Sequence, residues 1–351
     1  MGFIEATLET VEVCPLCGGT DAEFLTETKD RLHGLPGTFA LVSCHRCSLV
    51  RLSPRPTAES LPHYYPDEDY YSYQVEDADS HLERHGVKWF IRSSVLLGLG
   101  YEKISKGPLK RLLSPFLSLM FFGRATYGYG KRLPRFVEGG RALDVGCGSG
   151  KFLNLLKFLG WEVKGIEMSM TAAETARSKF GIQVFSGELA ACPFEKESFD
   201  FINISHVIEH LRNPVEDMKV IAGLLKPTGV MYVETPNILG AVNADGLQYW
   251  FPTDSPRHLF LFSPKVLREV LTSVGLAVDN ILFSHVEFAE WEYLYKLEEA
   301  EGKLDLNLRG AIHKLRHAVR MRKLRNRLLY FFNKSRGNTI QCWIRPAARP
   351  E

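Results

Sequence analysis

The chain has 351 residues, of which 45% are apolar, and a formal net charge of +2. This length suits about two domains and this apolar content fills a sizeable core, which excludes a disordered chain. The near-neutral balance lacks the overall basic field that is typical of nucleic-acid binders.

Membrane spans and secretion signals are not indicated either. No stretch approaches the roughly 18 uninterrupted apolar residues of a spanning helix. The opening "MGFIEATLET" lacks the basic start and apolar run of a secretory signal. We therefore expect a cytoplasmic protein.

Four of the seven cysteines form two CxxC pairs, Cys14 with Cys17 and Cys44 with Cys47. Two such pairs present four thiolates to a tetrahedral Zn²⁺ and leave no position for water or substrate. Two disulfides are the alternative, which a reducing compartment disfavours. The pattern predicts a zinc ribbon over residues 1–52 with a structural ion. Chelation should unfold this module and leave the rest folded.

Residues 53–135 form a predicted linker and helical segment. Ser53 to Tyr73 is rich in Pro, Tyr and acids and has no sustained period, which indicates a linker. The stretches "WFIRSSVLLGLG" and "LKRLLSPFLSLMFFG" predict helices that are too short and interrupted to span a bilayer. We expect these helices to cover the core; the alternative is a surface that contacts lipid or a partner.

From Arg141 the chain alternates short apolar strands with amphipathic helices, which is typical of an α/β fold with a parallel sheet covered on both faces. Strands are predicted at "RALDV", "EVKGI", "IQVF", "FDFINIS", "GVMYVET" and "AVDNILFSH". Helices are predicted after Gly150, after Met170, from Val215 to Leu225 and from Ser263 to Val274. The core domain then comprises residues 136–286 and 337–346.

The stretch "RALDVGCGSGKF" joins the first of these strands to a helix through Gly146, Gly148 and Gly150. This spacing is neither GxGxxG, the nicotinamide fingerprint, nor a P-loop. Two acids end neighbouring strands: Asp144 precedes the turn, and Glu167 ends the next strand, where a carboxylate accepts ribose hydroxyls. Such acids are costly to bury unless a ligand with N–H and O–H donors pairs with them.

With these motifs in this order, residues from about Arg141 to His285 resemble the class I S-adenosylmethionine-dependent methyltransferases. The matching segments are "LDVGCGSG", "GIEMS", "GELAACPFEKESFDFINISHVIEHL" and "LLKPTGVMYVETPN". The resemblance implies a Rossmann-like seven-stranded sheet whose last strand, "NTIQCWIR", is antiparallel. It also implies cofactor contacts, from the methionine end to the adenine and then the transferred methyl: Asp144, Gly146, Cys147 and Gly148; Glu167 and Met168; Glu188 and Leu189; and His206.

Some of these residues have simpler interpretations. Glu188 could be an exposed acid, and His206, Glu209 and His210 in "SHVIEH" could begin a helix with only local hydrogen bonds.

The segment "DSPRHLFLFS" follows the fifth strand of the predicted sheet, at its ligand end. With the ribbon, it resembles bacterial methyltransferases of glycan, nucleotide-sugar and secondary-metabolite pathways. We expect His258 to be the catalytic base and Arg257 to anchor an anionic substrate group, with Asp254 beside them. The alternative is a structural clasp over the cofactor. A large second domain behind the core is missing, which leaves O- and N-methylation open and disfavours C-methylation.

Residues 287–336 form a predicted helical insertion. Its first half is acidic, whereas Leu308 to Pro350 carries twelve Lys or Arg and no acid. Leu308, Ile312, Leu315 and Val319 recur at helical spacing, so one face is apolar. The helix over 308–336 could lie on an anionic membrane, bind nucleic acid, or pair with the acidic half. Membrane contact would make the cytoplasmic protein peripheral at the inner face.

The sequence thus predicts a methyltransferase that uses S-adenosylmethionine and acts on a small-molecule, sugar, glycan or lipid-linked acceptor. One rival is a ribosomal RNA or other nucleic-acid methyltransferase that uses the ribbon and basic helix. It is disfavoured by the net charge and by "NISHVIEH", which stands where base-methylating enzymes carry an Asn or Asp, Pro-Pro-aromatic signature. A non-catalytic scaffold is the other rival, and the intact glycine turn and both acids disfavour it.

Overall fold

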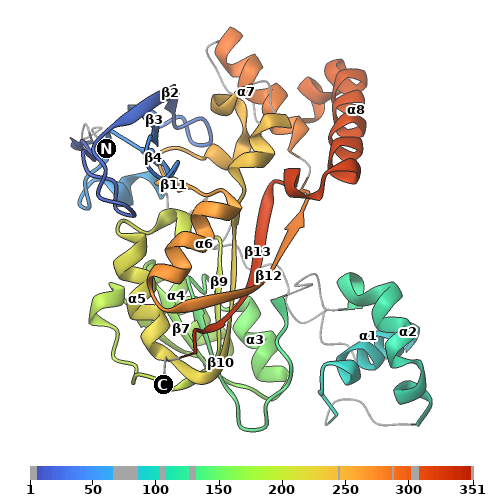
Figure 1. The fold of residues 1–351 in the computed structure, drawn as a ribbon. Helices are drawn as coiled ribbons and strands as arrows, with labels where there is room; N and C mark the ends of the chain where they lie inside the picture. The colour runs from blue at the N-terminus through green and yellow to red at the C-terminus, as the bar shows by residue number, and fades with distance from the viewer. Residues whose placement is uncertain are drawn as a thin grey trace.

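The computed structural model describes residues 6–65, 86–102, 108–125, 132–243, 246–286, 288–301 and 308–348. The last part of the predicted tyrosine-rich linker, residues 66–73, lies outside these residues. Figure 1 shows a central sheet flanked by helices, with a small β unit beside one end of it and two helical additions on the other side. None of the described helices combines the length and apolar character that a membrane crossing requires.

The central sheet has seven strands in the order β12-β13-β10-β9-β6-β7-β8. Their bounds are Arg141–Val145 (β6), Glu162–Glu167 (β7), Gln183–Ser186 (β8), Phe199–Ser205 (β9), Leu225–Pro236 (β10), Leu276–Ser284 (β12) and Thr339–Pro346 (β13). β13 pairs antiparallel with both β10 and β12, whereas the pairs among β6 to β10 are parallel. The predicted sheet and its antiparallel last strand are therefore confirmed.

Helices cover both faces of this sheet because its strands alternate buried apolar side chains between the two sides. Ile202 and Ile204 of β9 pack on one face with α5 (Pro214–Leu224) and α6 (Pro264–Ser273). Phe201 points to the other face, in a cluster with side chains of α1 (Gly86–Gly98) and α3 (Lys151–Phe158). α4 (Met170–Phe180) packs beside α3 through Ala173 and Ala176.

The N-terminal β unit is a four-stranded sheet in the order β11-β4-β3-β2. β2 (Ala22–Lys29), β3 (Thr38–Cys44) and β4 (Val50–Leu52) come from the predicted ribbon, but β11 (Phe260–Leu261) comes from the segment behind β10. A short pair, β1 (Leu8–Glu9) with β5 (Arg55–Pro56), completes the unit. Apolar side chains of β3, β4 and β11 belong to the same buried cluster as those of α5 and α6, so ribbon and core share one interior.

The remaining helices are α2 (Pro108–Ala125), α7 (Ala289–Glu301) and α8 (Leu308–Phe332). α2 packs against α1, and α8 packs against α7. The helices predicted over "WFIRSSVLLGLG" and "LKRLLSPFLSLMFFG" are confirmed as α1 and α2. The pairing of the basic half of the insertion with its acidic half is also confirmed. Ion pairs join α8 to α7, from Arg322 to Glu292 (2.9 Å) and from Lys323 to Glu290 (2.5 Å).

Candidate functional site

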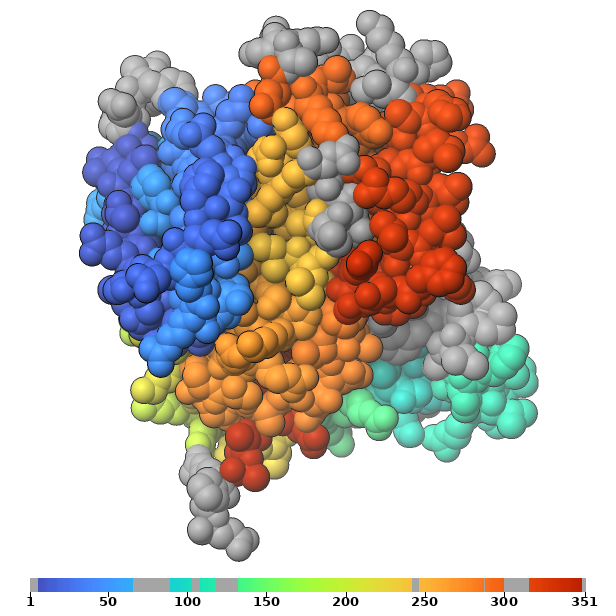
Figure 2. Space-filling view, turned by 45° about the horizontal axis from the view of Figure 1, so that its top comes forward, coloured from blue at the N-terminus to red at the C-terminus, as the bar shows by residue number. Residues whose placement is uncertain are grey.

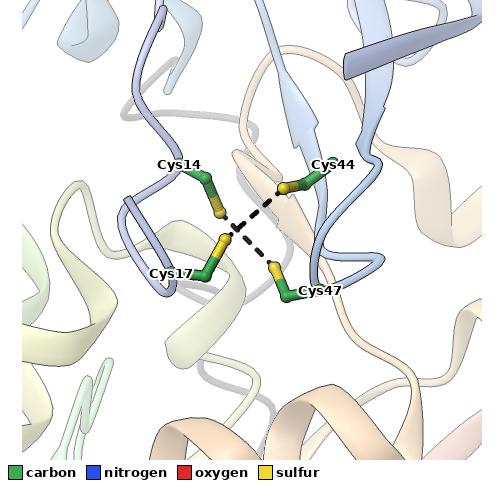
Figure 3. A group of neighbouring side chains, drawn as sticks. All are labelled: Cys14, Cys17, Cys44 and Cys47. Atoms are coloured by element: carbon green, nitrogen blue, oxygen red, sulfur yellow. Dashed lines mark hydrogen bonds between the residues drawn. The ribbon is translucent and has the colours of Figure 1, made fainter. Parts of the chain in front are cut away.

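The four N-terminal cysteines converge on one point from two turns (Figure 3). The Cys14 and Cys47 sulfurs lie 3.5 Å apart, as do those of Cys17 and Cys44. A disulfide requires about 2 Å, whereas four thiolates about 2.3 Å from a Zn²⁺ lie close to 3.8 Å from one another. The spacing therefore fits a tetrahedral metal site. Burial opposes ionisation of Cys44, but the backbone N–H groups of Cys47 and Arg46 outweigh it and lower the pKa of this thiol to about 7.

The glycine turn stands at the carboxyl end of β6, in the middle of the central sheet. Gly146, Gly148 and Gly150 all have positive φ angles, which residues other than glycine rarely adopt. A Cβ on Gly146 would lie 2.5 Å from Val207 Cγ2, so the turn touches the segment after β9. Because β6 and β9 are adjacent and parallel, both segments leave the sheet at the same edge.

The two predicted acids lie at this edge and are both buried. The Asn203 amide of β9 donates to Asp144 Oδ1 over 2.5 Å. Glu167 accepts two backbone hydrogen bonds, from Gly148 N (2.7 Å) and Ser169 N (2.9 Å), and so joins the end of β7 to the glycine turn. Burial raises the pKa of Asp144 to about 6 and raises that of Glu167. Buried acids beside an open glycine turn are typical of a ligand site.

The other predicted cofactor contacts divide into two groups. Met168 is 70% exposed, which leaves a large apolar side chain beside Glu167 for a planar ring to pack on. Glu188 is exposed and Leu189 half-buried, at the start of a 3-10 turn after β8. The Cys147 thiol, in contrast, is buried in the cluster beneath α3 and α4. The expected cofactor contact of Cys147 therefore stays a prediction for its backbone, which belongs to the turn.

His206 ends β9 in a left-handed conformation (φ 55°), which is rare for a residue with a side chain. Such conformations cluster at functional sites. Its Nδ1 donates to Glu209 Oε1 over 3.1 Å, so Nε2 keeps a lone pair, and half of the side chain is exposed. Burial favours the neutral imidazole, but the hydrogen bond and charge of Glu209 outweigh it and raise the pKa of His206.

Glu209 is fully buried and serves as the anchor of this histidine. Thr235 donates to its other oxygen over 2.9 Å. Burial opposes the charge on Glu209, but His206 and the neighbouring histidines lower its pKa to about 2. The His206 and Glu209 side chains, which we call the His-Glu dyad, therefore combine an accessible base with a fixed carboxylate.

Behind the dyad, the rings of His210 and His258 meet edge to face, 4.6 Å between centroids. The Nδ1 atoms face backbone carbonyls, His210 at 3.0 Å from Arg257 O and His258 at 2.7 Å from Pro252 O. Burial and the charge of His258 lower the pKa of His210 to about 4. Ligand atoms of Glu209, His210 and His258 lie within 4.8 Å of one another, a donor set that could also hold a divalent cation.

Arg257 has a different place from the one expected of an anion anchor. Its side chain is fully buried, and it donates to Asp254 Oδ1 (2.6 Å), Asp30 Oδ1 (2.9 Å) and Tyr64 O (3.1 Å). Asp30 belongs to the ribbon, so this guanidinium joins the ribbon to the segment that carries His258. We correct the assignment of Arg257, because its donors are directed to acceptors within the chain. The clasp considered as an alternative fits this geometry.

The sequence analysis named the main side chains of the site but missed several residues that hydrogen-bond to them. Asn203, Thr235 and Asp30 have no motif of their own. The signal for Glu209 was present, since a carboxylate three residues after His206 can reach its ring from the next turn. Nothing local indicated Asp30, whose partner lies far along the chain.

Fold and site together define the class. A doubly wound sheet with a glycine turn and acids at the ends of two adjacent central strands is a nucleotide-cofactor-binding α/β domain.

Comparison with known proteins names the domain. Residues 122–281 match a protein family described as "Methyltransferase domain". This stretch, less than half of the chain, contains the glycine turn, both acids and the His-Glu dyad, and it is similar to methyltransferase domains.

Curated relatives are similar to part of the chain. Two proteins named ubiquinone biosynthesis O-methyltransferase are similar to it. The one from Chelativorans sp. (strain BNC1) is 32% identical over 163 residues, 43% of this chain and 64% of the relative. The one from Rhizobium etli (strain CIAT 652) is 27% identical over 44% of this chain and 67% of the relative. The chain therefore spans less than two thirds of the length of the first of these relatives.

A solved S-adenosylmethionine dependent methyltransferase from Mesorhizobium loti is 16% identical, with a TM-score of 0.40, over 61% of this chain and 94% of that one.

Proposed function

We propose that the protein transfers the methyl group of S-adenosylmethionine to a small-molecule, sugar or lipid-linked acceptor. The observation that carries this proposal is the glycine turn with Asp144 and Glu167 at its sides and the His-Glu dyad against it. The methyltransferase domain and relatives named as small-molecule O-methyltransferases support it.

The residues at the sheet edge fit this cofactor. Asp144, fixed by Asn203, would accept from the amino group, and Glu167 would accept from the ribose hydroxyls while its bond to Gly148 N holds the turn. Met168 would cover the adenine. The cofactor supplies an electrophilic methyl group on a sulfonium. Alignment contributes most to such a displacement, about 7–11 kcal/mol.

We assign the base to His206 in preference to His258. The His206 ring is half exposed and its Nε2 keeps a lone pair, whereas the His258 side chain is only 8% exposed and packs on His210. Glu209 fixes the tautomer of His206 and stabilises the imidazolium that forms when Nε2 takes the acceptor's proton. Asp254 would act through Arg257 and His258 rather than on substrate.

Glu167→Ala is expected to weaken binding of S-adenosylhomocysteine at least about 100-fold, because it removes two hydrogen bonds to a charged group, each about 1.5–3 kcal/mol. Titration calorimetry measures this loss. Glu162→Ala, at the exposed opposite end of β7, is the matched control and should bind normally. Equal binding by both variants would contradict the cofactor site.

His206→Gln is expected to lower kcat about 10²–10⁴-fold while leaving S-adenosylhomocysteine binding intact. Because Glu209 raises the pKa of His206, Glu209→Gln should move the acidic limb of the kcat profile to lower pH. His63→Gln, on an exposed histidine in the 3-10 turn Leu61–Tyr64, is the control. Full turnover by His206→Gln together with loss in His258→Gln would transfer the role of base to His258.

The acceptor class is tested with methyl-labelled cofactor and a fractionated cell extract. Label in a small-molecule, glycan or lipid-linked fraction is the expected result. Label in RNA would overturn the proposed acceptor class and favour the nucleic-acid alternative.

We also propose that Cys14, Cys17, Cys44 and Cys47 bind one structural Zn²⁺. The sulfur separations support this, and the four thiolates fill a tetrahedron, so the ion would link the two turns and take no part in methyl transfer.

A further inference from the structure

Helix α8 has two faces of opposite character. Val319, Arg322 and Asn326 are buried at successive turns toward α7. Met321, Leu324, Leu328, Phe331 and Phe332 lie on the opposite side, each between 49% and 82% exposed. Because a residue advances about 100° around a helix, these five side chains form one stripe. We call it the α8 stripe.

Exposure of this stripe is a large departure from normal packing. Scattered exposed apolar residues need no explanation, but contiguous ones on one helix face mark a contact surface. The helix already has a partner on its other side, since Arg322 and Lys323 pair with acids of α7. Packing against α7 therefore explains the buried face of α8 and leaves the α8 stripe unexplained.

Charge identifies what the stripe contacts. Residues 308–332 include eight Lys or Arg and no acid. Arg316, Arg320 and Arg327 are exposed and, by helical spacing, lie along one border of the α8 stripe. Apolar residues bordered by Arg are the pattern of a helix that lies in the interface of an anionic bilayer. A second copy of the chain would bring this positive helix against itself, and phosphate binding alone does not require exposed Leu and Phe.

Helix α2 repeats the pattern on the same side of the molecule. Leu109, Leu112 and Phe116 are between 58% and 77% exposed and are spaced three and four residues apart. Arg111 is exposed beside them. Figures 1 and 2 place α2 and α8 on the same side, away from the ribbon. The exposed apolar side chains of α2 offer a second contact surface on this side of the molecule.

We propose that the α8 stripe, assisted by α2, docks the protein on an anionic lipid bilayer. This inference does not rest on the proposed function, because it uses none of the residues of the cofactor site. It would bring the domain to acceptors that are lipid-linked or apolar.

The test is sedimentation of the full-length protein with vesicles at low salt. Wild type should bind phosphatidylglycerol–phosphatidylcholine vesicles at least about tenfold more tightly than phosphatidylcholine vesicles, and salt should weaken this binding. Leu324→Glu/Leu328→Glu should abolish binding, and Arg320→Ala/Arg327→Ala should weaken it about tenfold or more. Val220→Glu, on the exposed face of α5, is the matched control and should bind as wild type does.

Three results would overturn the proposal. The first is failure of wild type to bind anionic vesicles, and the second is equal binding by the Leu324→Glu/Leu328→Glu variant. The third is a wild-type dimer, measured by light scattering, that becomes monomeric in this variant while neither protein binds vesicles. Binding of S-adenosylhomocysteine by wild type and variant, measured in parallel, shows that the variant is folded and keeps failure of docking distinct from failure of the methyltransferase assignment.

Discussion

Arg257→Met is expected to lower the free energy of unfolding by about 3–5 kcal/mol. The substitution leaves the carboxylates of Asp30 and Asp254 buried without their cation. Losing one partner of a buried pair is far more costly than replacing the whole group by neutral side chains. Denaturant unfolding measures the change.

The controls for this prediction are a neutral replacement and a matched surface arginine. Arg257→Met combined with Asp30→Asn and Asp254→Asn should recover most of the stability, because no unpaired charge remains. Arg268→Met, on the exposed face of α6, should change it little. Wild-type stability together with a raised KM for the acceptor would reinstate Arg257 as an anion anchor.

Removal of the proposed Zn²⁺ is expected to affect the proposed methyl-transfer site as well as the ribbon. β11 pairs with β4 through Phe260 opposite Arg51 and Leu261 opposite Val50, and Leu52 N donates to Leu259 O over 2.9 Å. His258 lies two residues before this strand. The sequence analysis expected chelation to leave the rest of the chain folded. Because β11 belongs to the ribbon sheet, we now expect chelation to loosen residues 258–262 as well. After chelation, amide exchange at 258–262 should be at least about tenfold faster, and methyl transfer should fall.

Cys44→Ser should reproduce the effect of the chelator, since it removes one of the four thiolates. Cys192→Ser, at a partly exposed cysteine outside the ribbon, is the control and should leave exchange unchanged. Unaltered exchange at 258–262 after complete loss of the ribbon's own protection would show that the two units are independent.

The sheet could be predicted because its information is local. Strands such as Phe199–Ser205 are short and rich in Phe and Ile, and the glycine turn and the acids at the ends of β6 and β7 are read directly from neighbouring residues. β11 could not be predicted in the same way. Two residues have no periodicity, and their pairing depends on a strand at the other end of the chain.

The roles of the charged residues near Asp254 depended on burial, which the sequence does not display. In the sequence, an arginine and a histidine at the ligand end of a sheet predict a substrate contact. The pattern is the same when buried acids pair with these side chains and keep them from substrate. Asp30, from the loop after β2, accepts from Arg257 together with Asp254 and the Tyr64 carbonyl. His206 was singled out from the sequence as a site residue, and that role stays a prediction. Its contact with Glu209 depends on the backbone turning back after β9.

The strand that ribbon and core share also constrains the order in which the two parts can fold during synthesis. β2, β3 and β4 leave the ribosome early, but the edge of β4 stays open until Phe260 and Leu261 emerge. An open strand edge is a template for wrong pairing. The N-terminal unit therefore stays incomplete until residues 260–261 have been translated. A nascent chain interrupted before residue 260 would expose that edge to its neighbours.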